Sequence, residues 1–295
     1  MGVSAMRALV VGIVGTLAAC ASPSQGQPPK EHAKARLVAE FARVMPGSTV
    51  WFGLDYEIEA GWHLYWDGVN DSGFATKLNA TGSPGVKVGP VVWPAPRRLV
   101  SPGNILDHIY EKHVTLLFPV EVPKDAKPGQ ELTIHAMPEW LVCHDVCLPG
   151  SADLTLKVSV AETGEKPSRT SEAPLFATAR QRVPKPLPKD NSPVSFTVTK
   201  DRVTVTADNA AEVAFYPFSD CVSLPELIKE GQKKGDRLTL TFEAQPGKHP
   251  VLKGVIEAKP SESGLPMLWS LEFDLSGVNK PAPEPSDKKA PVRGD

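Results

Sequence analysis

Short runs of alternating apolar and polar residues recur along the chain and constrain its fold more than any other feature. Between Thr49 and Glu59 every second residue is apolar, and the series is Val50, Phe52, Leu54, Tyr56 and Ile58. A period of two is that of a β-strand with one buried face. Similar runs occur at 114–118, 132–136 and 154–160, each bounded by Pro, Gly, Asn or Asp. The sequence therefore predicts an all-β fold built from short antiparallel strands.

The alternating runs fall into two groups, which predicts two β-sandwich domains. The first covers residues 36–161 and the second, smaller one covers 193–278. Residues 162–192 between them are rich in proline and charge, as a linker is, with one or two helical turns expected around Pro174 to Arg182. Inside the second domain, residues 225–235 (PELIKEGQKKG) predict a helical or loop insertion.

The two ends of the chain have the composition of processing and tether segments. Residues 1–20 carry one early charge at Arg7 and then an apolar run too short to span a bilayer, which predicts an export signal. Leu-Ala-Ala-Cys, ending at Cys20, is similar to the lipobox of bacterial lipoproteins, in which the cysteine is acylated. We expect a lipid anchor at Cys20, with ordinary secretion as the alternative. Residues 21–35 predict a flexible tether and residues 279–295 a disordered tail.

Composition excludes several classes of function. The 295 residues are 41% hydrophobic and 22% charged, with a net charge of -2, which is typical of a globular protein. There is no basic excess to neutralise phosphates, so no nucleic-acid partner is expected. No apolar run beyond the signal is long enough for a transmembrane helix, so we do not expect a membrane-embedded enzyme.

The segment EWLVCHDVCLPG, residues 139–150, contains two cysteines four positions apart. On a straight strand, residues four apart are separated by about 13 Å, roughly twice the reach of a disulfide. Cys143 and Cys147 can therefore bond only if residues 144–146 form a tight turn. A disulfide that encloses three residues removes little chain entropy, which argues against a purely structural bridge.

Two chemical interpretations of the pair stand beside that of a structural bridge. As metal ligands, Cys143, His144 and Cys147 would be joined by His135 or His113, but no second cysteine pair completes a closed site. As a redox dithiol, the pair would supply an accessible thiolate and a neighbouring sulfur that resolves a mixed disulfide. The redox interpretation fits best, and no resident metal or cofactor is expected.

The number of cysteines also bears on the role of Cys221. If Cys20 is acylated, three thiols remain, so an exported chain would retain at least one unpaired sulfur. Cys221 has no cysteine near it at any motif spacing. We expect it to be a buried, inert thiol that is dispensable for exchange.

Several segments resemble the periplasmic N-terminal domain of the transmembrane thiol:disulfide reductase DsbD, in particular the branch of the copper-sensitivity suppressor ScsB. They are WHLYWDGVNDSGFATKL at 62–78, VVWPAPRRL at 91–99, IYEKHVTLLFPVEVP at 109–123 and EWLVCHDVCLPGSADLTL at 139–156. AFYPFSD at 214–220 and LKGVIEA at 252–258 resemble the region that follows in the ScsB branch. The similarity spans roughly residues 36–275.

This resemblance implies immunoglobulin-like domains and a cysteine pair that carries electrons from a membrane-embedded reductase to periplasmic thioredoxin-like proteins. Carried over by position, Cys143 and Cys147 would be the active pair, with Cys147 forming the mixed disulfide and Cys143 resolving it. Sequence favours the same order, because the apolar strand before Cys143 is expected to be covered whereas Leu148-Pro149-Gly150 leaves Cys147 approachable.

The resemblance also implies residues that surround the pair. His63 and Tyr65 fall at positions where family members have aromatic residues lining the site. Residues 97–110 fall where a cap loop shields the disulfide, with Tyr110 the best placed aromatic. Trp140, just ahead of the pair, is a further candidate, although a core position is the commoner fate of a tryptophan in a β domain.

The chain departs from the resembled reductase in one respect: it shows no membrane-embedded region and no thioredoxin-like domain with its own Cys-x-x-Cys. The electron source is therefore expected to be a separate membrane-embedded thiol reductase. We expect the chain on the periplasmic side of the cell envelope, and Ala21 after Cys20 favours the outer membrane. A copper- or partner-binding module without turnover, and a structural accessory subunit of a membrane complex, are the alternative functions.

Overall fold

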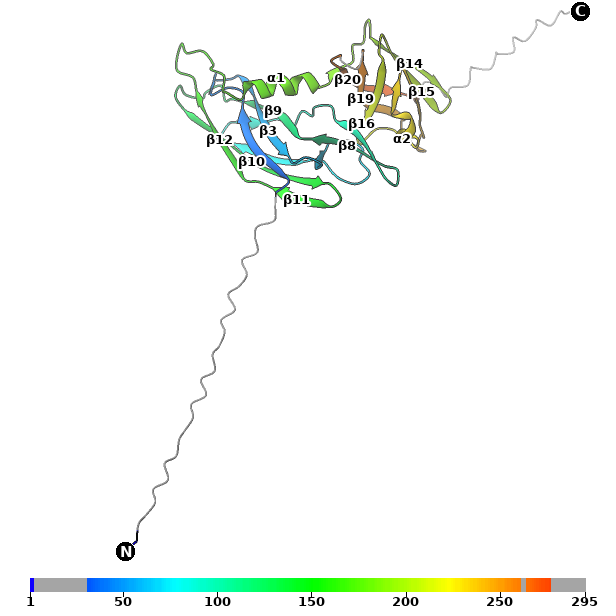
Figure 1. The fold of residues 1–295 in the computed structure, drawn as a ribbon. Helices are drawn as coiled ribbons and strands as arrows, with labels where there is room; N and C mark the ends of the chain where they lie inside the picture. Colours follow the sequence, from blue (N-terminus) through cyan, green and yellow to red (C-terminus); the bar gives the residue numbers. More distant parts are fainter. Residues whose placement is uncertain (3–30, 261–263, 277–295) are drawn as a thin grey trace, which may run out of the picture. The chain divides into compact units, whose positions relative to one another are not determined.

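The computed structural model describes residues 1–2, 31–260 and 264–276. The predicted export signal, Cys20, most of the tether and the tail lie outside these residues. Residues 31–260 and 264–276 belong to one compact unit. Within the described residues β-strands predominate and there are two helices (Figure 1), which confirms the predicted all-β class. No helix in this part of the chain combines the length and apolar character that crossing a membrane requires.

Two sheets are built from the first twelve strands, and their pairing is antiparallel except between β2 and β12. The four-stranded sheet has the order β1-β3-β9-β6. The eight-stranded sheet has the order β2-β12-β10-β4-β8-β7, with β5 and β11 also paired to β10. The strands are β1 (Ala33–Ala39), β2 (Arg43–Val44), β3 (Thr49–Ile58), β4 (His63–Tyr65), β5 (Lys77–Gly82), β6 (Lys87–Val88), β7 (Arg97–Ser101), β8 (Ile105–Glu111), β9 (His113–Glu121), β10 (Glu131–Cys143), β11 (Cys147–Ser151) and β12 (Leu154–Val160).

Two further sheets are built from the later strands. One has the order β13-β20-β19-β16-β17 and the other β14-β15-β18. Their strands are β13 (Lys185–Pro186), β14 (Val194–Thr199), β15 (Arg202–Ala207), β16 (Glu212–Pro217), β17 (Gln232–Lys234), β18 (Arg237–Thr241), β19 (Val251–Lys259) and β20 (Met267–Asp274). The segment predicted as a helical or loop insertion contains the one-turn helix α2 (Leu227–Glu230) and β17. The predicted domain boundaries themselves stay a prediction.

Two large hydrophobic cores follow from the alternation of the strands. The first core includes all five apolar residues of the run in β3 and the even-numbered residues of β10 from Leu132 to Val142, with Pro138 as the exception. The second is formed by residues such as Val203, Phe215 and Ile256. Burial of a large apolar side chain stabilises a fold by about 1.5–3 kcal/mol, so these two clusters supply most of the driving force for folding.

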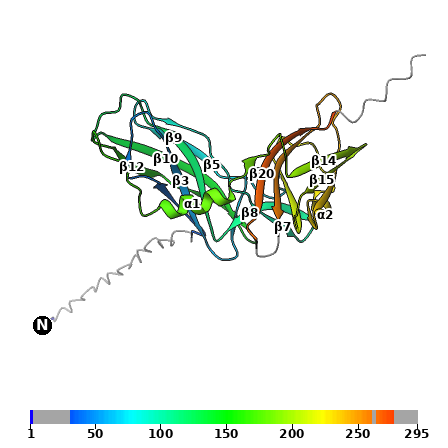
Figure 2. The same ribbon diagram turned by 90° about the horizontal axis from the view of Figure 1, so that it is seen from above.

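The segment predicted to be a linker packs against the four-stranded sheet. Residues Ala173–Arg182 form helix α1, with Pro174 in the first turn. N–H groups of the first turn have no acceptor within the helix, so the N–H that proline lacks costs no hydrogen bond there. Phe176 of α1 is completely buried in a small cluster with Val38 and Leu117. Figure 2 shows α1 alongside β3 and β9. The helix covers the face of this sheet that is turned away from the first core.

Phe176 anchors α1, and its removal tests how much this contact contributes. Truncation of a fully buried aromatic side chain leaves a cavity and typically costs about 3–5 kcal/mol. We expect Phe176→Ala to lower the free energy of unfolding by about that amount in urea titrations. Gln181→Ala, an exposed position on the same helix, is the matched control and should change stability by less than about 0.5 kcal/mol. Equal stability of the two variants would contradict the packing of α1.

Aromatic and polar side chains connect the two cores. Trp66 is fully buried and lies edge-on to His108 and tilted against Phe218, with ring centroids 5.9 and 5.5 Å apart. The ring of Tyr216 stands perpendicular to His108 at 5.5 Å. Leu106 of β8 belongs to the second core, although its strand pairs within the eight-stranded sheet. The β7–β8 hairpin therefore contributes side chains to both cores.

His108 lies in this junction and makes stability depend on pH. Its side chain is completely buried, and Nδ1 lies 2.6 Å from the carbonyl oxygen of Val69. Burial lowers the pKa of His108 to about 4. The unfolded chain, in which histidine titrates near 6.5, then binds a proton that the folded chain does not, so stability falls as pH drops through this window.

We expect the free energy of unfolding to decrease by on the order of 3 kcal/mol between about pH 6.5 and pH 4 through His108 alone. His108→Asn keeps a donor near the Val69 carbonyl oxygen but cannot be protonated, so it should flatten this part of the pH profile while lowering stability at neutral pH. His249→Asn, at an exposed position, should retain the slope. Urea unfolding at several pH values measures all three proteins, and an unchanged slope in His108→Asn would refute this origin of the pH dependence.

Candidate functional site

Cys143 and Cys147 form a disulfide across the β10–β11 hairpin. Their sulfur atoms are 2.04 Å apart and their Cα atoms 4.1 Å apart, and the two residues are direct partners in the strand register. The exposed residues His144 to Val146 form the connecting loop, in which the His144 N–H donates to the Val146 carbonyl oxygen at 3.1 Å. The prediction that a bonded pair requires a turn at 144–146 is confirmed. Among the described strands, β11 pairs with β10 alone.

The two sulfur-bearing residues differ sharply in exposure. Cys143 is 1% exposed and packs with Tyr65 and Ile109 in a cluster separate from the first core. Cys147 is exposed, together with the loop before it. Because Val142 faces the first core, its neighbour Cys143 lies on the opposite face of the eight-stranded sheet. A reagent or protein partner therefore meets Cys147 first.

Two of the predicted site residues, His63 and Tyr65, lie beside the disulfide. His63 is the register partner of Cys143, and the Tyr65 hydroxyl oxygen lies 3.8 Å from the Cys147 Sγ. The His63 Nε2 is 3.3 Å from that hydroxyl oxygen. Burial lowers the pKa of His63 and raises the pKa of Tyr65. Both side chains are therefore uncharged near neutral pH.

Two residues that the sequence interpretation missed extend this group. Ser72 Oγ lies 3.0 Å from the Tyr65 hydroxyl oxygen and donates to Asp107 Oδ2 at 2.6 Å. The amides of Asp71 and Ser72 both donate to Asp107 Oδ1 at 3.0 Å. Gly73 lies flat on the Tyr65 ring, since a Cβ there would be 2.1 Å from a ring carbon. Ser72 lies in the Asp-Ser-Gly triplet of the segment at 62–78 that resembles the DsbD domain, and this triplet could have identified it as a site residue. No sequence pattern distinguishes Asp107.

Tyr110 and Trp140 are not brought to the sulfur pair. Tyr110 is the neighbour of Ile109 and points to the other face of β8, where its hydroxyl donates to the Pro94 carbonyl oxygen at 2.5 Å. Trp140 is 5% exposed and lies edge-on to Tyr56 in the first core, with centroids 5.2 Å apart. The stretch expected to be a cap loop, 97–110, instead forms most of the β7–β8 hairpin, from which Leu99 packs against the cluster that contains Cys143.

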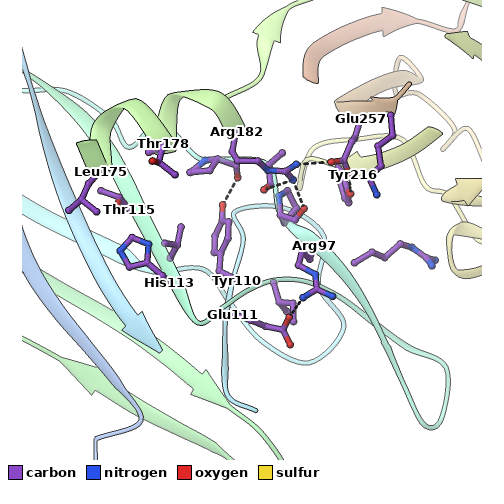
Figure 3. Close-up of a pocket in the computed structure, with 18 of the residues that line it drawn as sticks. Arg97, Tyr110, Glu111, His113, Thr115, Leu175, Thr178, Arg182, Tyr216 and Glu257 are labelled. Carbon is purple, nitrogen blue, oxygen red and sulfur yellow. Dashed lines mark hydrogen bonds and ion pairs between the residues drawn. The ribbon is translucent and has the colours of Figure 1, made fainter. Parts of the chain in front are cut away.

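Tyr110 borders a pocket of about 520 Å³ beside α1, shown in Figure 3. Arg182 at the end of α1 donates to Glu257 at 2.7 Å and to the Ala95 carbonyl oxygen at 3.1 Å. The hydroxyl of Tyr216 donates to the same Glu257 carboxylate. Because the half-buried Arg182 and the buried Tyr216 both pair with the buried Glu257, we interpret the pocket wall as a structural network that ties α1 to β16 and β19.

Cys221 is a free thiol far along the chain from the disulfide. Its Sγ accepts a hydrogen bond from the Lys253 N–H at 3.4 Å, and its side chain packs against the second core. Burial raises the pKa of the Cys221 thiol to about 11, which disfavours the reactive thiolate. In the part of the chain that the structure describes, no group of three or more His, Cys, Asp or Glu residues is placed to hold a metal ion.

Comparison with known proteins agrees with this geometry. Residues 34–159 match the family model described as thiol:disulfide interchange protein DsbD, N-terminal. The crystal structure of the N-terminal periplasmic domain of ScsB from Proteus mirabilis superposes with a TM-score of 0.51 at 16% identity, covering 84% of this chain and 96% of that one. At this identity the similarity to ScsB shows a shared fold.

Other matches carry less information. A variant of BcpA, the major pilin subunit of Bacillus cereus, gives a TM-score of 0.26 at 10% identity, covering 82% of this chain and 65% of that one. A score this low supports no structural argument. No curated protein sequence matches the chain.

Proposed function

We propose that the chain is a thiol:disulfide interchange protein that acts through Cys143 and Cys147, a proposal supported by the match of residues 34–159 to the family model of the DsbD N-terminal domain. The observation that carries the proposal is the unequal exposure of a disulfide on a short hairpin, with Cys147 open to a partner and Cys143 buried beneath it. A buried second sulfur close to an exposed one is the arrangement that resolves mixed disulfides.

The proposed reaction proceeds in two exchanges. The Cys147 thiolate of the reduced domain attacks the disulfide of a thioredoxin-like protein, forming a Cys147–partner disulfide and releasing one partner sulfur as a thiolate. Cys143 then attacks the Cys147 sulfur, which forms the Cys143–Cys147 disulfide and releases the partner as a dithiol. Two electrons pass to the partner, and a separate membrane-embedded thiol reductase restores the domain by the same exchanges in reverse order.

A lipid anchor at Cys20 would serve this cycle by confinement. A protein held near a membrane meets a membrane-embedded reductase at a higher effective concentration, provided that both occupy the same membrane. We propose attachment on the periplasmic side of the envelope. Ala21 after the lipobox cysteine favours the outer membrane, where the anchor would raise this effective concentration only for a reductase in that same membrane. The predicted tether, residues 21–35, would then act as the spacer up to β1, which begins at Ala33, inside the predicted segment.

The order of attack can be tested by removing one sulfur at a time. Reduced Cys143→Ser should accumulate a covalent complex with a thioredoxin probe that keeps only its attacking cysteine, supplied as a mixed disulfide with thionitrobenzoate, because neither protein then holds a resolving sulfur. Cys147→Ser should form little or none, since Cys143 is buried. Non-reducing gels and intact mass measure the adduct, which dithiothreitol should release. All variants carry Cys20→Ser, so that an unprocessed Cys20 cannot react.

Cys221→Ser is the matched control and should behave as the wild type, because its thiol is half-buried and its pKa is raised. A complex trapped only by Cys147→Ser would reverse the roles of the two sulfurs. If neither single variant traps the probe, the interchange proposal fails and a binding module without turnover becomes the better interpretation.

A further inference from the structure

A continuous series of hydrogen-bonding groups runs from a buried carboxylate to the exposed sulfur of the disulfide. Asp107 is 2% exposed and accepts from the Ser72 hydroxyl at 2.6 Å. The Ser72 Oγ lies 3.0 Å from the hydroxyl oxygen of Tyr65, and that oxygen lies 3.8 Å from the Cys147 Sγ. Four groups from β8, the loop after β4, β4 itself and β11 are thus linked in one line.

The direction of each hydrogen bond follows from the number of protons available. An ionised carboxylate only accepts, so the single hydroxyl proton of Ser72 is directed at Asp107. Ser72 then has no proton for Tyr65, and the 3.0 Å contact requires Tyr65 to be the donor. Ser72 is itself exposed, but a hydroxyl-to-carboxylate bond at 2.6 Å is charge-assisted and competes well with water.

His63 does not change this direction. Its Nε2, 3.3 Å from the Tyr65 oxygen, either donates to that oxygen or accepts from it, depending on the tautomer. In both cases the Tyr65 proton is directed away from Cys147. A disulfide sulfur carries no proton, so in the oxidised state the 3.8 Å approach brings a lone pair of Tyr65 to the Cys147 Sγ. Once the pair is reduced, the hydroxyl oxygen can accept the Cys147 thiol proton and does not stabilise a thiolate.

We propose that Asp107 is a positioning residue that, through Ser72 and Tyr65, orients the Tyr65 lone pair toward Cys147 and so holds the reduced Cys147 as a thiol. This rests on the proposed function, in which Cys147 is the attacking sulfur. A partner that displaces Ser72 or contributes a donor of its own would release the thiolate at the moment of contact, and the free domain would be protected from indiscriminate exchange.

Other ionisable groups near Cys147 do not impose a direction of this kind. His144 and Asp145 in the loop pair with each other at 2.9 Å and are open to solvent. Glu111 of β8 is the register partner of His63 and forms an ion pair with Arg97. These groups contribute charge to the surroundings of the sulfur, whereas Asp107 also fixes which way the protons point.

The decisive variant is Asp107→Asn. An asparagine oxygen can still accept the two backbone amides, while its NH₂ group takes the position that faces Ser72 and donates to it. Ser72 is then free to donate to Tyr65, and Tyr65 to donate to Cys147. Because a hydrogen bond to a charged group stabilises that charged form, we expect the pKa of Cys147 to fall by about one unit.

The pKa of Cys147 is measured from the pH dependence of its alkylation by iodoacetamide after reduction with dithiothreitol, with the Cys147 peptide quantified by mass. The background is Cys20→Ser with Cys221→Ser. Asp71→Asn is the matched control, because it removes a neighbouring carboxylate. The Asp71 carboxylate accepts a hydrogen bond from the Leu106 amide. It should lower the pKa of Cys147 much less than Asp107→Asn does.

Tyr65→Phe separates proton direction from charge. In a Tyr65→Phe background, Asp107→Asn should lower the pKa of Cys147 no further than Asp71→Asn does. Should Asp107→Asn misfold, Ser72→Ala replaces it, since freeing Tyr65 from its acceptor should shift the pKa in the same direction. An unchanged or raised pKa in these variants, or a decrease that is as large without Tyr65 as with it, would overturn the inference.

The alkylation result and the trapping result are independent. A lowered pKa in Asp107→Asn together with no trapped complex in Cys143→Ser would retain the hydrogen-bond chain and remove the interchange function. Trapping with an unchanged pKa would retain interchange and remove the role of Asp107.

Discussion

The alternation of side chains along β10 determines where the disulfide lies. Even-numbered residues from Leu132 to Val142 mostly point into the first core, so Cys143, one residue further, must point to the other face of the sheet. Its direct register with Cys147 then brings the second sulfur to the same face, at the rim of the hairpin. A shift of one residue in this pairing would bury both sulfurs in the core or separate them.

A few buried polar side chains hold distant parts of the chain in place around this strand. Asp107 binds the loop after β4 through three hydrogen bonds, and Glu257 binds the end of α1 through Arg182. Glu40, which is 3% exposed, is paired with Arg180 of the same helix. Since an unpaired buried charge is costly, each of these contacts fixes one relative placement of the elements that it joins.

Sequence was a good guide wherever a local pattern carried the information. The run from Val50 to Ile58 identified β3 and its buried face, and the spacing of Cys143 and Cys147 required the turn that the hairpin makes. The family resemblance placed His63 and Tyr65 beside the disulfide, but it did not foresee that Tyr110 faces the opposite side of β8. Contacts such as Ser72 with Asp107 join residues 35 positions apart, and no periodicity encodes which hydroxyl meets which carboxylate.

The hairpin edge that presents Cys147 also has a consequence for solubility. A Cα separation of 4.1 Å is that of a non-hydrogen-bonded pair, and Pro149, two residues further along β11, is in the same phase, so its ring nitrogen faces the unpaired edge. At the Pro149 position this edge offers no amide hydrogen to an incoming strand, whereas another residue would offer one. A five-residue edge with an interrupted row of donors is a poor template for stacking copies of the chain into a continuous sheet, so the exposed Cys147 can lie at a strand edge without promoting aggregation.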